Sequence, residues 1–341
     1  MCGSGCGKGR QGCERIMSEM HSPKVSVLMI AYNQEAYIGE AIRGVVSQKA
    51  PFPFELIVAD DASTDSTAEV AAGWAARYPD VIRLVRRETN LGLQANYLDA
   101  YSRARGEYIA ICEADDWWCS RHKLARQARM LDEHPEYGLC FHRVVNYYQS
   151  DGSMSLSNPG QPSRITLEGL ARANVISNLS VMYRAIPYDR LPGWVASVRL
   201  FDYAMHSLHA ERGDIGYLSQ PMAVYRRHDK GIWSGDLLGG WRMAMDVREC
   251  LISHFHSSRR SVADCYAESY LDIAAAMTAA GDDGARERAM SFFDRLGMVF
   301  DGDDFDERVK QRSSRLQSAP GFLSKIRRRV SRLLPLPRIR G

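Results

Sequence analysis

From Lys24 onward, short apolar runs alternate with segments whose apolar residues recur at helical spacing. Residues 25–30 form a run long enough for a buried strand, and apolar residues then follow at positions 38, 41, 42, 45 and 46, the spacing of an amphipathic helix. The pattern continues to residue 141 and predicts strands at 25–30, 54–59, 81–85, 108–112 and 137–141, with helices at 38–46, 67–78, 93–103 and 121–134. Such alternation predicts βαβ units and an α/β fold with a mostly parallel sheet.

The second half of the chain is less regular. Within 143–235 we predict helices at 166–173 and 201–210 and extended segments at 178–183 and 216–225, and long helical patterns follow at 241–255 and 262–280. The chain therefore divides into a glycine- and cysteine-rich leader expected to be disordered (1–23), an α/β domain (24–235), a helical appendage (236–318) and a basic tail (319–341).

The ends of the predicted strands carry polar residues where ligands bind in parallel sheets. Tyr32 and Asn33 follow the first strand, Asp60-Asp61-Ala62-Ser63-Thr64-Asp65 follows the second, and Glu113-Ala114-Asp115-Asp116 follows the fourth. Neither a dinucleotide-binding G-x-G-x-x-G nor a G-x-x-x-x-G-K-[ST] phosphate loop is present. Clustered carboxylates repel one another unless a cation lies between them, so this edge favours a hard divalent ion that bridges carboxylates to substrate phosphates.

Four motifs in this order resemble glycosyltransferase family 2, in particular members with an acidic-Asp-Asp-Trp motif. They are VSVLMIAYNQEAYIGEAI, FELIVADDASTDST, ETNLG and GEYIAICEADDWWCSRHKLARQ, and the resemblance covers roughly residues 24–235. It implies a GT-A-like fold and an inverting transfer of a sugar from a nucleotide-diphosphate sugar to an acceptor hydroxyl.

The resemblance also assigns residues to the donor. Asp61 takes the position that reads the nucleotide base, Tyr32 lines the base beside Asn33, and Asp115 and Asp116 hold Mn²⁺ or Mg²⁺ with the donor phosphates. Glu113 stands where the family more often has Asp, and is expected to hold the donor sugar or the loop. The alternatives are an ordinary half-buried aromatic for Tyr32 and a solvated helix-capping turn for Asp115 and Asp116. For Asp60 and Asp65 the alternative is helix capping and loop bonding.

Two later segments complete the expected site. Asp202 matches the acidic residue near the acceptor and would be the general base, with an N-cap of helix 203–210 as its alternative and Asp189 and Asp214 as rivals. Tyr225-Arg226-Arg227-His228, with Trp233 shortly after, resembles the family's closing segment. There His228 would bind the metal or diphosphate, Arg227 a phosphate, and Trp233 would close over the donor.

Composition changes this picture only at the ends of the chain. The 341 residues are 45% hydrophobic and 25% charged with a net charge of +3, which argues for a globular protein and gives no sign of nucleic-acid binding. There is no apolar run long enough for a membrane span, no signal peptide, and the eight cysteines are expected to be reduced, so we predict a cytoplasmic protein. Residues 322–341 carry seven basic residues and an apolar stripe, a pattern typical of a helix at an anionic membrane surface; a solvated tail is the alternative.

The sequence thus predicts a sugar transferase of polysaccharide or cell-envelope glycan assembly, peripheral at the inner face of the plasma membrane, with a glycan or lipid-linked acceptor. Two other functions fit the same fold class. A sugar-nucleotide nucleotidyltransferase is disfavoured by Tyr32-Asn33 after the first strand, where a glycine-rich basic loop would be needed. A non-catalytic sugar-nucleotide binding module is disfavoured by the acidic motifs and Asp202.

Overall fold

The computed structural model describes residues 22–228, 237–282, 284–298, 307, 309 and 311. Its strands are β1 (Val25–Ala31), β2 (Phe54–Asp60), β3 (Ile82–Arg86), β4 (Tyr108–Ile111), β5 (Trp117–Trp118), β6 (Tyr137–Tyr148), β7 (Met154–Leu156), β8 (Arg164–Ile165), β9 (Met182–Arg184) and β10 (Asp214–Arg227). Its α-helices are α2 (Ile38–Val46), α3 (Thr67–Arg77), α4 (Leu93–Ser102), α5 (Lys123–Glu133), α6 (Leu167–Arg172), α7 (Phe201–Ala210), α8 (Leu237–Phe255), α9 (Arg260–Ala279) and α10 (Gly284–Arg295). Short 3₁₀ turns are η1 (Asn178–Ser180), η2 (Tyr188–Arg190) and η3 (Gly193–Ser197).

The ten described strands belong to one sheet, in which eight follow the order β3-β2-β1-β4-β9-β6-β10-β5, while β7 pairs with β6 and β8 pairs with β10. The strands β3, β2, β1 and β4 are mutually parallel, and β6 is parallel to β10. Short β9 lies antiparallel between β4 and β6, so these two strands share a direction. The expected mostly parallel sheet is confirmed, and the carboxyl ends of its long strands meet at one edge.

The two faces of the sheet are covered by different helices. Alternate residues of β1 point to opposite faces, because side chains alternate along a strand. Val25, Val27 and Met29 pack in the cluster that includes α2 and α5, whereas Leu28 packs in the cluster that includes α4, α7 and the C-terminal helices. Burial on both faces explains why the predicted strands read as unbroken apolar runs.

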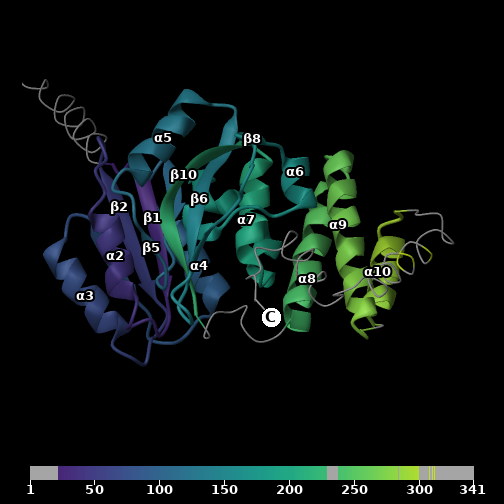
Figure 1. Ribbon diagram of the computed structural model, residues 1–341, viewed down its shortest axis with the longest axis horizontal. Helices are drawn as coiled ribbons and strands as arrows, with labels where there is room; N and C mark the ends of the chain where they lie inside the picture. The colour runs from purple at the N-terminus through teal and green to yellow at the C-terminus, as the bar shows by residue number, and fades with distance from the viewer. Residues whose placement is uncertain are drawn as a thin grey trace, which may run out of the picture.

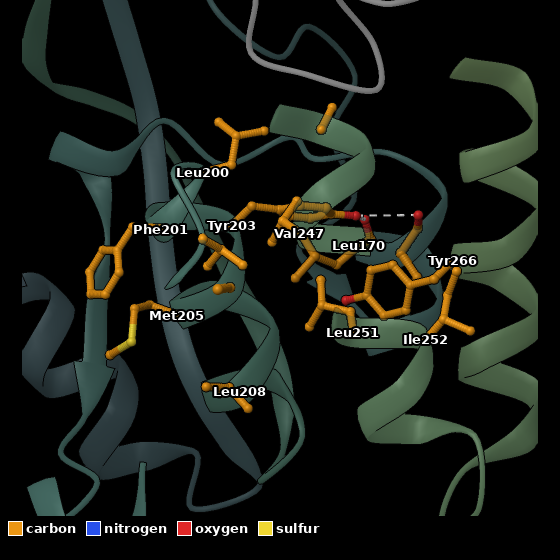
Figure 2. Packing of buried hydrophobic residues seen from close by; sticks show 14 of the residues in the cluster. Leu170, Leu200, Phe201, Tyr203, Met205, Leu208, Val247, Leu251, Ile252 and Tyr266 are labelled. Atoms are coloured by element: carbon orange, nitrogen blue, oxygen red, sulfur yellow. Dashed lines mark hydrogen bonds between the residues drawn. The ribbon is translucent and has the colours of Figure 1, made fainter. Parts of the chain in front are cut away.

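The helices α8, α9 and α10 pack against the sheet domain through α6 and α7 (Figure 1). Figure 2 shows Tyr203 of α7 among Leu170 of α6 and Val247 and Leu251 of α8, all of them in one hydrophobic cluster. The Tyr203 hydroxyl donates to the carbonyl of Leu170 at 3.0 Å. The residues predicted as an appendage therefore share a continuous core with the sheet domain.

The predicted elements of residues 25–141 are all present, with each bound within two residues of the prediction apart from the end of β6, which continues to Tyr148. The segment 178–183 was expected to be extended, yet it opens with the 3₁₀ turn η1 before β9 begins at Met182. This turn is held locally, because the Ser180 hydroxyl donates to the carbonyl of Ser177 at 2.6 Å. Residues 1–21 of the expected leader, and the basic tail, lie outside the described residues. Among the helices that are described, none has the length and apolarity that crossing a membrane requires.

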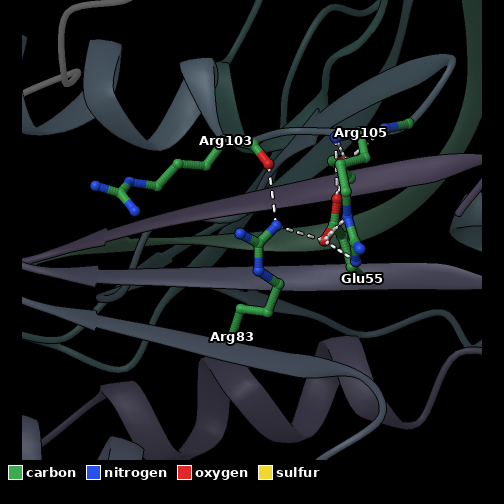
Figure 3. A network of polar contacts seen from close by, with 6 residues as sticks. Glu55, Arg83, Arg103 and Arg105 are labelled. Carbon is green, nitrogen blue, oxygen red and sulfur yellow. Dashed lines mark hydrogen bonds and ion pairs between the residues drawn. The ribbon is translucent and has the colours of Figure 1, made fainter. Parts of the chain in front are cut away.

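A polar network ties the strands together at the amino edge of the sheet (Figure 3). Glu55 of β2 is 2% exposed and receives hydrogen bonds from Ser26, Arg83 and Arg105. Burial raises the pKa of Glu55, but the hydrogen bonds from Arg105, Ser26 and Arg83 lower it by more, so the net shift is downward. The carboxylate at this edge is thus neutralised by the protein's own cations.

Candidate active site

A cavity of about 470 Å³ opens at the carboxyl edge of the sheet. Five of the residues predicted from the sequence line it, namely Tyr32, Asp61, Glu113, Asp115 and Asp202. They come from the ends of β1, β2 and β4 and from the start of α7. The residues predicted to bind the donor therefore lie at one cavity, as the direction of the parallel strands requires, and Asp202 of α7 lies there with them.

Asp61 is 3% exposed and both of its carboxylate oxygens are already engaged. Oδ1 accepts the N–H of Leu91 at 2.8 Å and Oδ2 accepts the N–H of Gly92 at 2.9 Å. Gly92 has a φ of 83°, a conformation that glycine adopts without strain, and it immediately precedes α4. Asp61 thus fixes the Asn-x-Gly loop to the end of β2 and keeps a lone pair on each oxygen for a further donor.

Asn33 lies between two loops and does not line the cavity. Its side-chain oxygen accepts the N–H of Thr64 at 2.8 Å, and its own N–H donates to Ser63 Oγ at 3.0 Å. Asp65 accepts the N–H of Thr67 at 3.0 Å and that of Glu35 at 3.1 Å. These contacts join the loops after β1 and β2, so Asn33 shapes the cavity from behind its wall, and Asp65 has the loop-bonding role expected as its alternative.

The acidic loop after β4 holds one half-buried carboxyl group, that of Glu113, and one buried carboxyl group, that of Asp116. Glu113 accepts a hydrogen bond from Asn178 at 3.2 Å, and Asp116, 1% exposed, accepts the N–H of Arg226 through Oδ1 at 2.7 Å. Burial, together with the charge of Asp115, raises the pKa of Glu113 to about 8 and also raises that of Asp116. Asp116 does not line the cavity; it ties the acidic loop to β10.

Asp115 lines the cavity and contacts His228, which lies behind it and outside the cavity lining. The Oδ2 atom of Asp115 lies 3.2 Å from Nε2 of His228, and the Asp115 side chain is 30% exposed. His228 Nδ1 is buried without a partner among the described atoms. Within the described residues, no cluster of three or more His, Cys, Asp or Glu side chains is arranged to hold a metal. A carboxylate beside an imidazole fits an ion such as Mn²⁺ or Mg²⁺ whose remaining ligands are substrate phosphates and water.

Arg226 is the cation that organises the acidic loop. Its guanidinium donates to the carbonyl of Asp115 at 2.9 Å and to Glu40 of α2 at 2.7 Å, and it stacks 4.5 Å from the Trp117 ring. Arg227, predicted to bind a phosphate, instead donates to Asn146 at 3.2 Å and does not line the cavity. Its Nε and one terminal nitrogen are buried without partners among the described atoms. Trp233, the expected lid, lies outside the described residues.

Asp202 lies in the first turn of α7 and lines the cavity. The helix cap is Leu200, so the alternative reading of Asp202 as the N-cap is wrong. Burial raises the pKa of Asp202, and the N–H of Tyr203, which Asp202 accepts at 2.8 Å, lowers it by less. The rivals lie elsewhere: Asp189 is in η2 outside the cavity lining, and Asp214 opens β10 at the opposite edge and pairs with Arg164.

Sequence reasoning missed four residues of this site. Asn178 holds Glu113, Arg226 holds the acidic loop, Tyr97 of α4 lines the cavity, and Met243 of α8 closes its far side. Arg226 could have been found, since it sits in the Tyr-Arg-Arg-His motif. Nothing in the local pattern around Asn178 or Met243 marks them, because their roles arise from tertiary contacts.

Comparison with known sequences decides the family. The profile described as Glycosyl transferase family 2 matches residues 26–229. The chain belongs to glycosyltransferase family 2. The match ends before α8, so α8, α9 and α10 lie beyond the part that defines the family.

Relatives of the chain agree with this family. An uncharacterized Mycobacterium tuberculosis protein, Rv1520, is 45% identical over 212 residues, 61% of this chain and 60% of that protein. The chain thus spans about 60% of the length of this relative. EpsE of Bacillus subtilis, named as a glycosyltransferase, is 32% identical over 61% of this chain and 74% of that protein.

Two solved structures share the fold. Staphylococcus aureus TarS residues 1–349, in complex with UDP-GlcNAc, align with a TM-score of 0.50 and 17% identity, covering 85% of this chain and 90% of that chain. The mannosyltransferase PcManGT of Pyrobaculum calidifontis, in complex with GDP-Man and Mn²⁺, aligns with a TM-score of 0.50 and 20% identity, covering 87% of each chain. These likenesses show the GT-A fold.

Proposed function

We propose that the protein is an inverting glycosyltransferase that moves a sugar from a nucleotide-diphosphate sugar to an acceptor hydroxyl. The observation that carries the proposal is the convergence of Asp61, Glu113, Asp115 and Asp202 on one cavity at the carboxyl edge of the sheet. The two structural neighbours bind UDP-GlcNAc and GDP-Man, which supports a donor of this chemical class.

The nucleoside end of the donor would lie between the loops after β1 and β2. Tyr32 is 47% exposed at the cavity and offers a ring for the base to pack on, while Asp61 can accept a ring N–H of the base through a remaining lone pair. Because Asp61 already fixes Leu91 and Gly92, the loop that faces the donor is ordered before the donor binds. Such preorganisation lowers the entropic cost of binding.

The diphosphate would lie near Asp115 and His228. A Mn²⁺ or Mg²⁺ ion held there with donor phosphates would offset the negative charge that develops on the leaving diphosphate. Arg226 keeps Asp115 in place through its main-chain carbonyl, and Asp116 fixes the same loop to β10. Glu113, held by Asn178, would face the donor sugar from the cavity wall.

Asp202 would act as the general base from the opposite wall of the cavity. In a single displacement, the acceptor oxygen attacks the anomeric carbon, the bond to the diphosphate breaks, and the acceptor proton passes to the Asp202 carboxylate. Phe201, Leu200 and Met243 line the cavity around Asp202 and would exclude water that competes with the acceptor.

The proposal for the pathway is supported by the relatives of the chain and not by the geometry of this cavity. TuaG of Bacillus subtilis, named for teichuronic acid biosynthesis, is 29% identical over 47% of this chain and 62% of that protein. We therefore propose a role in polysaccharide or cell-envelope glycan assembly with a glycan or lipid-linked acceptor. We also propose a cytoplasmic enzyme that reaches the inner face of the plasma membrane through the basic residues of 319–341.

A screen of nucleotide sugars tests the proposal. UDP-, GDP- and dTDP-sugars are added to the full chain with Mn²⁺ or with EDTA, and the melting temperature and the release of nucleoside diphosphate are measured. A true donor at a hundredfold excess over its Kd stabilises the fold by about 2.7 kcal/mol, and only with the metal. Binding without release of nucleoside diphosphate, with or without acceptor extracts, would favour a binding module; pyrophosphate formed from a nucleoside triphosphate and a sugar phosphate would favour a nucleotidyltransferase.

A further inference from the structure

A second cavity, of about 570 Å³, lies between the η3 segment, which is within the family match, and helices α8 and α10, which are beyond it. Its wall is formed by η3, α8 and α10, with Trp194, Glu249, Ser253, His254 and Arg295 among the lining residues. We propose that this cavity binds a neutral oligosaccharide portion of the acceptor, made of hexose or N-acetylhexosamine units. The proposal rests on the proposed function, because it treats the cavity as an extension of the acceptor side.

The chemistry of the lining fits a sugar. A pyranose packs its C–H face on an aromatic ring and needs hydrogen-bonding side chains around its hydroxyl groups. Trp194 supplies the ring and packs edge-on against His254 at 5.9 Å, while Glu249, Ser253 and Arg295 supply an acceptor, a hydroxyl and donors. A pocket of this size with an aromatic wall and a few convergent polar groups is typical of small-ligand sites.

The polar groups of the cavity are held in place by contacts outside it. Glu249 Oε1 accepts the hydroxyl of Tyr270 at 2.6 Å and the Nε–H of Arg288 at 2.8 Å, and the Glu249 side chain is still 20% exposed. His254 Nε2 lies 3.0 Å from Glu211 of the turn after α7. Side chains that are fixed before a ligand arrives lose less freedom on binding, which is the arrangement expected of a binding site.

The cavity is connected to the candidate active site by two elements. The segment 192–202 contributes Pro192 and Trp194 to this cavity and Asp202 to the catalytic one. Helix α8 contributes Met243 to the catalytic cavity and Cys250 to this one, a rise of about 10 Å along the helix axis. The two cavities therefore lie beside the same segment and the same helix, and the proposal places the terminal acceptor hydroxyl at Asp202 and the following sugar units toward this cavity.

Fluorine NMR of the full chain tests the inference. The six tryptophans are replaced by 5-fluorotryptophan, and the Trp194 resonance is assigned by its loss in Trp194→Phe. Cello- and chito-oligosaccharides of two to four units are then titrated. We expect them to shift the Trp194 resonance. They should leave that of Trp74, on α3 in the other half of the molecule, unchanged.

A cavity-filling variant separates loss of oligosaccharide binding from loss of folding stability. Ser253 lies on the exposed side of α8, so Ser253→Trp occupies the cavity without removing a core side chain. It should abolish the oligosaccharide-induced shift while the melting temperature and nucleotide-sugar binding stay as in wild type. No shift with any of these sugars, or a shift that persists in Ser253→Trp, would overturn the subsite. Loss of metal-dependent nucleotide-sugar binding in the wild type would instead overturn the proposed function, which separates the two failures.

Discussion

The pKa values of carboxyl groups shift in opposite directions at the two edges of the sheet. At the amino edge, Glu55 is surrounded by donors from Ser26, Arg83 and Arg105, and its pKa lies below the ordinary value of 4.5 (Figure 3). At the carboxyl edge, burial raises the pKa values of Glu113 and Asp202. The first edge contains its own counter-charges, and the second leaves carboxyl groups that an incoming cation or substrate can use.

The sign of each shift determines its effect on stability. A carboxyl group whose pKa is lowered by folding stabilises the fold above its unfolded pKa, and that contribution is lost as the pH falls through the folded pKa. Glu55 behaves in this way. A carboxyl group whose pKa is raised by folding destabilises the fold at neutral pH, as Asp202 does, and the fold gains stability as the pH falls. The carboxyl edge therefore carries a cost in stability, which is the pattern of sites where stability is traded for function.

The largest effect is expected for Asp202→Asn. If Asp202 is the general base, the variant loses about 10²–10⁴-fold in kcat and keeps its affinity for the donor nucleotide. Its melting temperature should be unchanged or higher, because a buried group with a raised pKa has been replaced by a neutral one. The measurement is kcat beside donor affinity and melting temperature, with Asp189→Asn, outside the cavity, as the control. A well-folded Asn variant with near-normal kcat would move the base away from Asp202.

The next effect concerns the metal. Asp115→Asn should weaken the Mn²⁺-dependent binding of UDP or GDP by at least about 100-fold, since the loss of an outer partner alone costs about 10–100-fold. EDTA should have the same effect on the wild type, and His228→Gln a smaller one, because it leaves the carboxylate in place. Calorimetry with each nucleotide measures this. Equal affinity in Mn²⁺ and in EDTA would mean that nucleotide binding at the carboxyl edge does not require a divalent cation.

The sequence predicted the lining of the candidate active-site cavity better than the contacts that hold its loops. Tyr32, Asp61, Glu113, Asp115 and Asp202 could be placed at one edge because strand ends and family motifs are local signals. Asn33 and Asp116 were placed at the right edge, but the sequence could not show that their side chains fix loops. That distinction depends on which backbone amides lie nearby, and those come from segments 31 and 110 residues away.

The fold shows the same division between local and tertiary information. Apolar periodicity predicted the strands and helices through residue 141 and the long helices α8 and α9, because each carries its own pattern. It did not predict that these helices share a core with α6 and α7, since that depends on the packing of residues such as Tyr203 against Leu251 (Figure 2). The extended prediction at 178–183 was partly wrong because Ser180 bonds to its own turn.

The amino edge gives a smaller effect, on stability alone. Glu55→Gln removes a charge that two arginines share and should cost about 1.5–3 kcal/mol at pH 7, the usual range for hydrogen bonds to charged groups. The difference from wild type should shrink as the pH falls from about 4.5, where Glu55 of the unfolded chain takes up a proton, and should vanish below the lowered pKa of folded Glu55. Urea unfolding at several pH values measures this. Glu107→Gln, at an exposed position of the same edge, is the matched control and should change stability by less than about 0.5 kcal/mol.

The smallest effect is expected for Asp61→Asn. Asp61 combines features of the carboxyl groups at the two edges of the sheet. Asp61 is at the carboxyl edge, yet its counter-charges are the backbone amides of Leu91 and Gly92. Asparagine keeps one acceptor oxygen and loses the charge, so the loop should stay folded while the second amide is left poorly paired. We expect nucleotide binding to weaken by about 1 kcal/mol, roughly fivefold to tenfold, with a similar loss of stability.

Calorimetry with UDP, together with thermal unfolding of Asp61→Asn, separates the two roles of this carboxylate. Asp80→Asn, an exposed position before β3, serves as the control and should change neither quantity. If stability falls while nucleotide affinity is unchanged, Asp61 serves only to hold the loop after β3, and the base must be read by other groups. If affinity falls by more than stability, the carboxylate also contacts the donor, because a loop effect alone would weaken binding only through the loss of order at Leu91 and Gly92.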